Sequence, residues 1–246
     1  MSTPTRRNMM MAGIAISAGV SGTVAAARIA AGRYGLIPPD AGGLYGCGHT
    51  LTYAAQRLLT GHARAREFNA SQISKTPHPK GNPPKGEEFA RLRAGRFQDW
   101  RLEVNGMVSR PRTFSIAELK SYPPRNQITQ LICEEGWSYI AEWTGAPLAY
   151  LIEAVGGVSP KARYAVYHSM DGWVDGIDLD EARHAQTLVS YGMNGSDLVV
   201  GHGGPLRLRV PKQLGYKSLK FLQKVTFTDT LQGVAGDGDY SWYAGI

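Results

Sequence analysis

The sequence predicts one mixed α+β domain over about residues 97–235, and three features of this region predict it. Short stretches alternate apolar and polar residues, as strands with one buried face do. Helix-capping signals lie between several of these stretches. No internal repeat is visible, and the region is long enough to bury a single core. Short strands with a few intervening helices are typical of an α+β architecture.

The predicted strands are apolar stretches, most of which alternate with polar residues. They cover residues 101–104, 127–132, 164–167, 206–210 and 224–227. Asn105–Gly106 is a dipeptide typical of hairpin turns and precedes Met107–Val108, so we expect a tight turn there. Asn194–Gly195 predicts a second turn.

Three short helices are predicted from their ends. Ser115 with Glu118 forms a capping box at the start of the first helix. The second begins at Pro147 and ends at Gly156–Gly157. Its apolar face consists of Leu148, Leu151, Ile152 and Val155. The third is capped by Asp178 with Glu181 and is expected to run to about His184.

Residues 1–31 have the layout of an export signal. Arg6 and Arg7 precede an uncharged stretch over residues 10–27 that is rich in Ala and Gly. Paired arginines in this position are typical of twin-arginine signals, which predicts a periplasmic protein. A retained membrane anchor or an ordinary amphipathic helix is the alternative.

Residues 32–96 contain too few apolar residues for a core of their own, so we expect an irregular segment that wraps the domain. Within it, residues 53–66 could form a helix, and the proline-rich stretch 76–84 is expected to be loop. Residues 236–246 form an aromatic C-terminal tail.

Composition excludes several classes of function. The net charge of +7 comes without any Lys/Arg run longer than two, so no nucleic-acid partner is expected. Cys47 and Cys133 are the two cysteines of the sequence, too few for a four-thiolate zinc or iron–sulfur site.

Cys133 follows an apolar strand and precedes two acids and Gly136, so the thiol is expected at the rim of a pocket. Two alternatives remain at this point. Cys133 could be a buried apolar residue, or it could form a disulfide with Cys47, which an oxidising compartment would permit.

Two basic segments predict an anion site. Residues 201–211 combine a glycine-rich turn with Arg207 and Arg209 on one face of a strand. Residues 215–220 combine glycine, serine and two lysines, which suit a phosphate or another anion. The alternative for either segment is a solvated strand face.

Together these pieces resemble the sulfite-oxidase-type molybdopterin-binding oxidoreductases. Within that family they are similar to the bacterial periplasmic branch that contains the protein-methionine-sulfoxide reductase catalytic subunits. The resemblance covers roughly residues 100–229. It is carried by residues 133–138 (CEEGWS), 143–145 (WTG), 171–173 (DGW), 204–207 (GPLR) and 215–220 (GYKSLK).

The resemblance implies a Mo-molybdopterin cofactor in a domain of the sulfite oxidase type. Cys133 would supply the protein thiolate to molybdenum. Further residues implied to bind the cofactor are Asn69, Ser169, His202, Arg207, Lys217, Ser218, Leu219 and Lys220. Ser169 and His202 stand where the reductase branch has Thr and Asn, and both keep hydrogen-bonding capacity.

Glu135 matches an acid near the metal in the reductase branch and is therefore a candidate catalytic residue. With Glu134 beside it, the pocket mouth would disfavour a dianion such as sulfite. We therefore expect two-electron oxygen-atom transfer with a neutral donor, such as a small or protein-bound sulfoxide. Sulfite oxidation within the same family is the alternative.

The sequence leaves two other classes of function open. Cys133 with His168, His184 or His202 could form a nucleophilic Cys–His site, although no spacing favours one pairing. A metal-free periplasmic binding module is the non-enzymatic alternative. Because no haem motif is present, the resemblance implies an electron donor such as a membrane b-type haem subunit, which the aromatic tail could dock.

Overall fold

The computed structural model describes residues 63–231, which form two β-sheets with short helices. The first sheet has the strand order β2-β1-β10-β5-β6. Its members are β1 (Arg101–Gly106), β2 (Arg112–Ser115), β5 (Tyr164–Ser169), β6 (Val174–Asp178) and β10 (Leu222–Thr228). β1 and β10 pair in parallel, and the other neighbours are antiparallel. The first and last strands of the described region are thus joined at the centre of this sheet.

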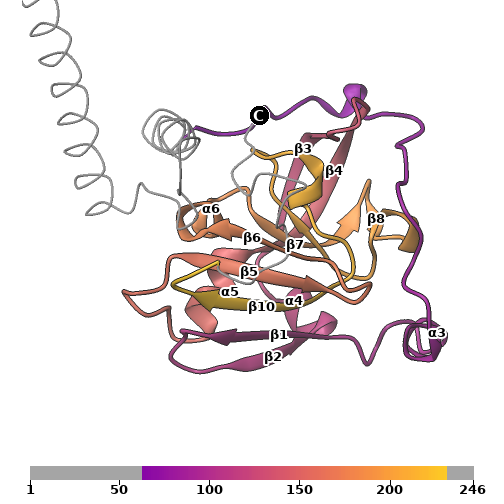
Figure 1. Ribbon diagram of the computed structural model, residues 1–246. Coiled ribbons are helices and arrows are strands. Elements are labelled where there is room, and N and C mark those ends of the chain that lie inside the picture. Colours follow the sequence, from indigo (N-terminus) through magenta and orange to yellow (C-terminus); the bar gives the residue numbers. More distant parts are fainter. Residues whose placement is uncertain (1–62, 232–246) are drawn as a thin grey trace, which may run out of the picture. The chain divides into compact units, whose positions relative to one another are not determined.

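The second sheet is antiparallel and is built around β4. Its members are β3 (Arg125–Ile132), β4 (Ser138–Pro147), β7 (Leu188–Met193), β8 (Ser196–Asp197) and β9 (Arg207–Arg209). β8 pairs with the end of β7, and β9 pairs with its beginning. Strands β3 and β4 run across the direction of β1, β2 and β10 (Figure 1).

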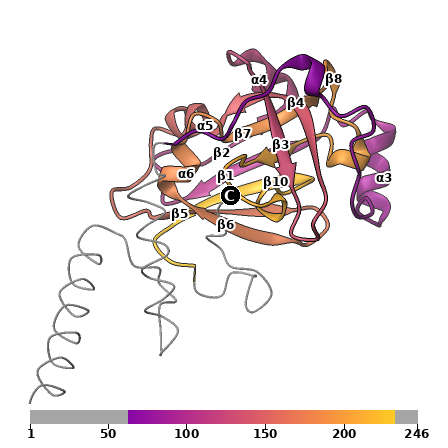
Figure 2. The same ribbon diagram turned by 90° about the horizontal axis from the view of Figure 1, so that it is seen from above.

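The helices α3 (Glu87–Ala94), α4 (Ile116–Ser121), α5 (Leu148–Ala154) and α6 (Leu179–Arg183) are all short. The predicted caps are confirmed, because Ser115 accepts a hydrogen bond from the Glu118 amide and Asp178 accepts one from the Glu181 amide. α5 and α6 lie together at the end opposite α3 (Figure 2). Three 3-10 turns complete the elements: η1 (Ala70–Gln72), η2 (Val200–His202) and η3 (Gly215–Lys217).

The main hydrophobic core lies between the sheets and includes residues from both. A smaller cluster, built around Leu131, Tyr139 and Trp143, occupies the other part of the second sheet. Because β3 and β4 carry this smaller cluster, it lies next to the loop that begins at Cys133. The prediction of an α+β fold is confirmed.

Three local expectations are corrected. Asn105–Gly106 is not a turn but the end of β1, where Gly106 lies opposite Phe227 of β10 and leaves no space for a side chain. The chain therefore reverses further on, over residues 107–111. The segment 32–96 is not irregular throughout, since α3 places Phe89 and Leu92 in the core. The longest strand, β4, was not among the predicted strands.

The described part of the N-terminal segment is held against the second sheet. The Phe68 amide donates to the Ile128 carbonyl of β3, and Ser74 exchanges two hydrogen bonds with Ile140 of β4. In Figure 1 this indigo chain crosses one end of β3 and β4 and continues to α3. Residues 63–66 lie outside any helix.

Several predictions fall on residues that lie outside the described ones. These are the signal or anchor over residues 1–31, most of the possible helix over residues 53–66, and the tail over residues 236–246. In the stretch from residue 63 to residue 231, no helix has the length and apolar character that a membrane span requires.

Candidate active site

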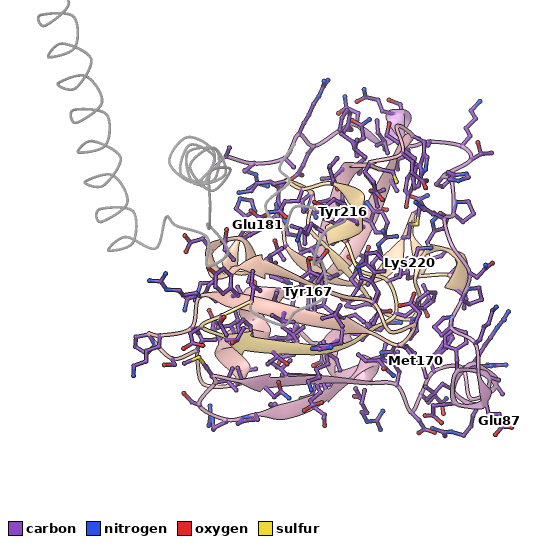
Figure 3. The ribbon with its side chains drawn as sticks, in the orientation of Figure 1. Glu87, Tyr167, Met170, Glu181, Tyr216 and Lys220 are labelled. Atoms are coloured by element: carbon purple, nitrogen blue, oxygen red, sulfur yellow. The ribbon has the colours of Figure 1, made fainter. Side chains whose placement is uncertain are left out.

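One cavity of about 300 Å³ collects most of the predicted site residues. Its walls come from distant parts of the chain: the loop after β3, the first half of β4, the turn between β5 and β6, η2, β9 and the loop 215–220. His78 and Lys80 of the N-terminal segment also line it. Figure 3 labels Tyr216 and Lys220, two members of this lining.

Cys133 lies where β3 ends and the chain turns. The turn is closed by two hydrogen bonds, from the Cys133 amide to the Trp137 carbonyl and from the Gly136 amide to the Cys133 carbonyl. Gly136 has a φ of 90°, which favours glycine there. The Cys133 thiol is free and lines the cavity although the residue is only 5% exposed. Cys47, the partner in the disulfide alternative, lies outside the described residues. Burial raises the pKa of the Cys133 thiol.

We call Glu134, Glu135 and Lys80 the acidic mouth of the cavity, because the two carboxylates outnumber the one ammonium. Glu134 lines the cavity, with its Oε2 atom 3.4 Å from the Cys133 sulfur. Glu135 is exposed and does not line it; its carboxylate lies 2.5 Å from the Lys80 ammonium and accepts from the Trp137 indole at 2.9 Å. These hydrogen bonds lower the pKa of Glu135. The role predicted for Glu135 stays a prediction.

The basic wall, as we call Arg207, Arg209 and Lys220, borders the cavity: Arg207 and Lys220 line it, whereas Arg209 lies buried outside the lining. Arg207 and Arg209 point the same way from β9, and each guanidinium lies 5.4 Å from the ring of Trp143. Arg207 donates to the carbonyls of Ser218 and His202, at 2.9 and 3.0 Å. The alternative of a solvated strand face is wrong for this segment, because both arginines are buried.

The positive charge of the basic wall is not balanced by an ion pair, although Asp171 of the same lining attracts Lys220. Among residues 63–231, no carboxylate lies within ion-pair distance of Arg207, Arg209 or Lys220. Arg209 is completely buried, and burial beside Arg207 lowers its pKa to about 9. Buried charge without a partner is unfavourable, so this wall fits a bound anion.

Lys220 and His202 bring further polar atoms to the cavity. The Lys220 ammonium donates to the carbonyls of Gly201 and Lys80, and burial lowers its pKa to about 8. His202 is held neutral because burial and the neighbouring cations lower its pKa to about 4. Its Nδ1 atom is buried without a hydrogen-bond partner, so its hydrogen-bonding capacity is unused.

Of the four residues in the loop 215–220 that were expected to bind the cofactor, Lys217 does not line the cavity. Ser218 and Leu219 line the cavity, although the Ser218 hydroxyl already accepts from Arg209 and from the Val210 amide. Lys217 does not line the cavity, because its ammonium lies in a buried ion pair with Asp175.

Two further predicted cofactor ligands lie outside the lining. Ser169 is buried next to it, where its hydroxyl accepts from the Asp171 amide. Asn69 is exposed at the start of η1, and its backbone N–H donates to the Gln72 side-chain oxygen.

The alternative of a nucleophilic Cys–His pair receives little support from the site. His168 and His184 do not line the cavity, and His202 is T-shaped against Tyr139 rather than hydrogen-bonded to Cys133. Sequence reasoning also missed Lys80 at the mouth, and it included Arg209 in the predicted anion site but not among the cofactor-binding residues.

Comparisons with known proteins show what the chain is similar to. A family model described as the oxidoreductase molybdopterin binding domain matches residues 91–233. A protein of Azospira oryzae named as a protein-methionine-sulfoxide reductase subunit, YedZ1, is 35% identical over 147 residues, which cover 59% of this chain and 56% of that protein. The protein-methionine-sulfoxide reductase catalytic subunit MsrP of Ralstonia nicotianae is 32% identical over 167 residues, which cover 60% and 50%.

The chain thus spans about half the length of these two relatives. Among solved structures, the sulfane dehydrogenase SoxCD from Paracoccus pantotrophus has a TM-score of 0.52 at 22% identity. That match covers 56% of this chain and 39% of the other, and it supports the fold.

Proposed function

The chain belongs to the family of oxidoreductase molybdopterin-binding domains, and from this premise we propose that it is a Mo-molybdopterin enzyme that reduces a sulfoxide. The observation that carries the proposal is a single cavity with a free thiol at its mouth and an unbalanced basic wall behind it. The names of the two reductase relatives support the choice of a sulfoxide.

The residues of the cavity fit the cofactor. A thiolate is a suitable ligand for a metal already bound by sulfur, and Cys133 is the thiol that lines the cavity. Arg207 and Lys220 would hold the anionic end of the molybdopterin, because their charges have no carboxylate partner in residues 63–231. The unpartnered Nδ1 of His202 would bind a polar pterin atom.

When bound, the cofactor supplies two-electron oxygen-atom transfer. The overall reaction is balanced as a sulfoxide plus two protons and two electrons giving a thioether and water. The chain's own residues orient the reactants and restrict water. Trp137 and Tyr139 stack with ring planes 3° apart and both line the cavity, so apolar rings surround the space beside Cys133.

The charges at the mouth favour a neutral substrate over sulfite. Glu134 and Glu135 carry two negative charges, and Lys80 balances one of them. A dianion would therefore approach a mouth of net negative charge, whereas a sulfoxide carries no net charge to be repelled. Arg207, the arginine in the cavity lining, already donates to two protein carbonyls.

Kinetics with methionine sulfoxide and sulfite side by side test this proposal. We expect turnover of the sulfoxide by the full chain supplied with an artificial electron donor, and no turnover of sulfite. Molybdenum and pterin content are measured on the same preparation. Turnover of sulfite alone would contradict the proposal, and a protein without metal would favour the binding module.

We further propose a separate electron donor and export by the twin-arginine route. Both relatives carry names of subunits, which supports a partner, and a membrane b-type haem subunit is the donor proposed. Residues Arg6 and Arg7 support export. Cell fractionation of the protein and of its Arg6→Lys/Arg7→Lys variant tests the location: we expect the variant to stay in the cytoplasm.

A further inference from the structure

The loop 215–220 contains one residue that faces away from the site. Gly215, Tyr216, Ser218, Leu219 and Lys220 all line the cavity. Lys217 does not, although it carries a positive charge and lies in the middle of this segment, which is predicted to bind an anion. The direction of Lys217 therefore calls for a different role from that of Lys220.

Lys217 makes its contacts on β6. It is completely buried, and its ammonium lies 2.5 Å from Asp175 Oδ1 and donates to the Gly176 carbonyl at 2.9 Å. The Gly176 amide donates to the same Asp175 oxygen at 2.6 Å. Asp175 lies directly across from Tyr167 of β5 in the sheet, so its position is fixed by two paired strands.

We propose that Asp175 and Lys217 form a positioning pair, which holds the loop 215–220 in the shape that binds the anionic end of the cofactor. Lys217 acts through Asp175 and does not itself contact the cofactor. This inference rests on the proposed function, because it assumes that the basic wall holds molybdopterin.

Each charge of the pair depends on the other. Burial raises the pKa of Asp175 and lowers that of Lys217, while the mutual attraction opposes both shifts. Removing one partner leaves an isolated buried charge, which is far more unfavourable than removing both. The loop would then have to move to hydrate that charge.

Such a movement would reach the cavity through the neighbouring residues. The Lys217 ammonium lies 5.4 Å from the ring of Tyr216, the residue that precedes it in the sequence, and Tyr216 lines the cavity. The residue that follows Lys217 is Ser218, whose carbonyl accepts from Arg207 and whose hydroxyl accepts from Arg209. A bound group held by several such contacts tolerates displacements of only about 0.5 Å.

A double-mutant cycle on the full chain tests the pair. The variants are Asp175→Asn, Lys217→Gln and the combination of both, in which two neutral amides can hydrogen-bond to each other. Pterin released by acid and molybdenum are measured per chain after purification. Glu181→Gln is the matched control, because Glu181 forms a similarly buried ion pair with Lys212 at 3.0 Å and does not line the cavity.

We expect each single variant to hold roughly fivefold less cofactor and the double variant to recover to within about twofold of the wild type. Glu181→Gln should load normally. A direct contact between Lys217 and the cofactor gives another pattern: Asp175→Asn loads fully, and Lys217→Gln and the double variant are equally empty. That pattern overturns the proposal. Normal cofactor loading of both single variants overturns it too. So does a Glu181→Gln variant that holds as little cofactor as Asp175→Asn.

A second measurement uses cofactor-free protein and is independent of both loading and turnover. Trypsin cleavage within residues 212–220 is expected to be several-fold faster in Asp175→Asn than in the wild type or in Glu181→Gln. Equal cleavage rates overturn the positioning role. An enzyme that loads cofactor but leaves sulfoxides unchanged would contradict the proposed reaction alone.

Discussion

The two sides of the cavity handle charge in opposite ways. On the basic wall, Arg207 and Arg209 are buried and donate to carbonyl and hydroxyl oxygens, with no carboxylate within ion-pair distance among residues 63–231. At the acidic mouth, the charges are partly exposed, and Lys80 forms an ion pair with Glu135 at 2.5 Å.

This difference indicates what each side binds. A wall with uncompensated buried charge is unfavourable when empty, so it suits a group that stays bound and supplies the missing negative charge. Exposed paired charges interact weakly with each other and with solvent ions. The mouth therefore suits a substrate that must enter and leave, and Cys133 lies at the boundary between the two.

Replacing Cys133 by Ser is expected to have the largest effect and to separate the two sides. Activity should fall by more than about 100-fold, since even residues that only support metal ligands contribute 10- to 100-fold. Pterin content should change by less than about twofold, because the basic wall is intact. Sulfoxide turnover and acid-released pterin check this on one preparation. Parallel loss of both would mean that the wall does not hold the pterin independently.

Arg207→Met is expected to give the opposite result. Cofactor content should fall roughly tenfold, because the guanidinium is one of the few cations that line the cavity. The cofactor-free variant should lose at most about 1 kcal/mol of stability relative to the wild type. The reason is that the change removes a buried charge that has no carboxylate partner. Chemical denaturation and pterin analysis measure the two quantities. Arg207→Lys serves as the charge-retaining control. A strongly destabilised cofactor-free Arg207→Met protein would mean that the buried charge of Arg207 stabilises the fold.

Lys220 makes the basic wall sensitive to pH. Its pKa is lowered to about 8, so in the cofactor-free protein the ammonium loses its proton as pH rises through that value. Binding of inorganic phosphate should therefore weaken severalfold between pH 7 and 9. The unfolded chain keeps this proton to higher pH than the folded one, so Lys220 should also make the stability rise with pH above about 8.

Titration calorimetry with phosphate, run on the wild type and Lys220→Met, isolates this effect. The variant should bind phosphate more weakly at pH 7 and should show a flatter dependence on pH. An identical pH profile in both proteins would assign the titration to another group.

Sequence patterns predicted those parts of the site that are fixed within a few residues. The caps at Ser115 and Asp178 and the common direction of Arg207 and Arg209 depend on helix and strand periodicity, and they are present as expected. The position of Cys133 at the end of a strand has the same origin.

The contacts that were missed are those between distant segments. Lys80 reaches the mouth because Ser74 anchors its segment to β4, and no local pattern near residue 80 encodes that anchor. Lys217 and Lys220 have the same side chain in the same short loop. Their different directions depend on Asp175, which lies on another strand.

Lys80→Met is expected to have the smallest effect and to act at the mouth alone. Its ion pair with Glu135 is half-exposed, so the free energy of unfolding should change by less than about 1 kcal/mol. The mouth would lose its one balancing charge, so inhibition by an anion such as sulfite should weaken a few-fold. The KM for a neutral sulfoxide should change by less than about twofold.

The effect on sulfite should also fade at high salt, because exposed charges are screened within roughly 3 Å at 1 M ionic strength. Lys75→Met is the matched control, because Lys75 is an exposed lysine of the same segment and does not line the cavity. If Lys80→Met raised the KM for the neutral sulfoxide as much as it weakened inhibition by sulfite, the mouth would select by shape and not by charge. The basic wall and the acidic mouth would then differ in how deeply their charges are buried, and not in what those charges select.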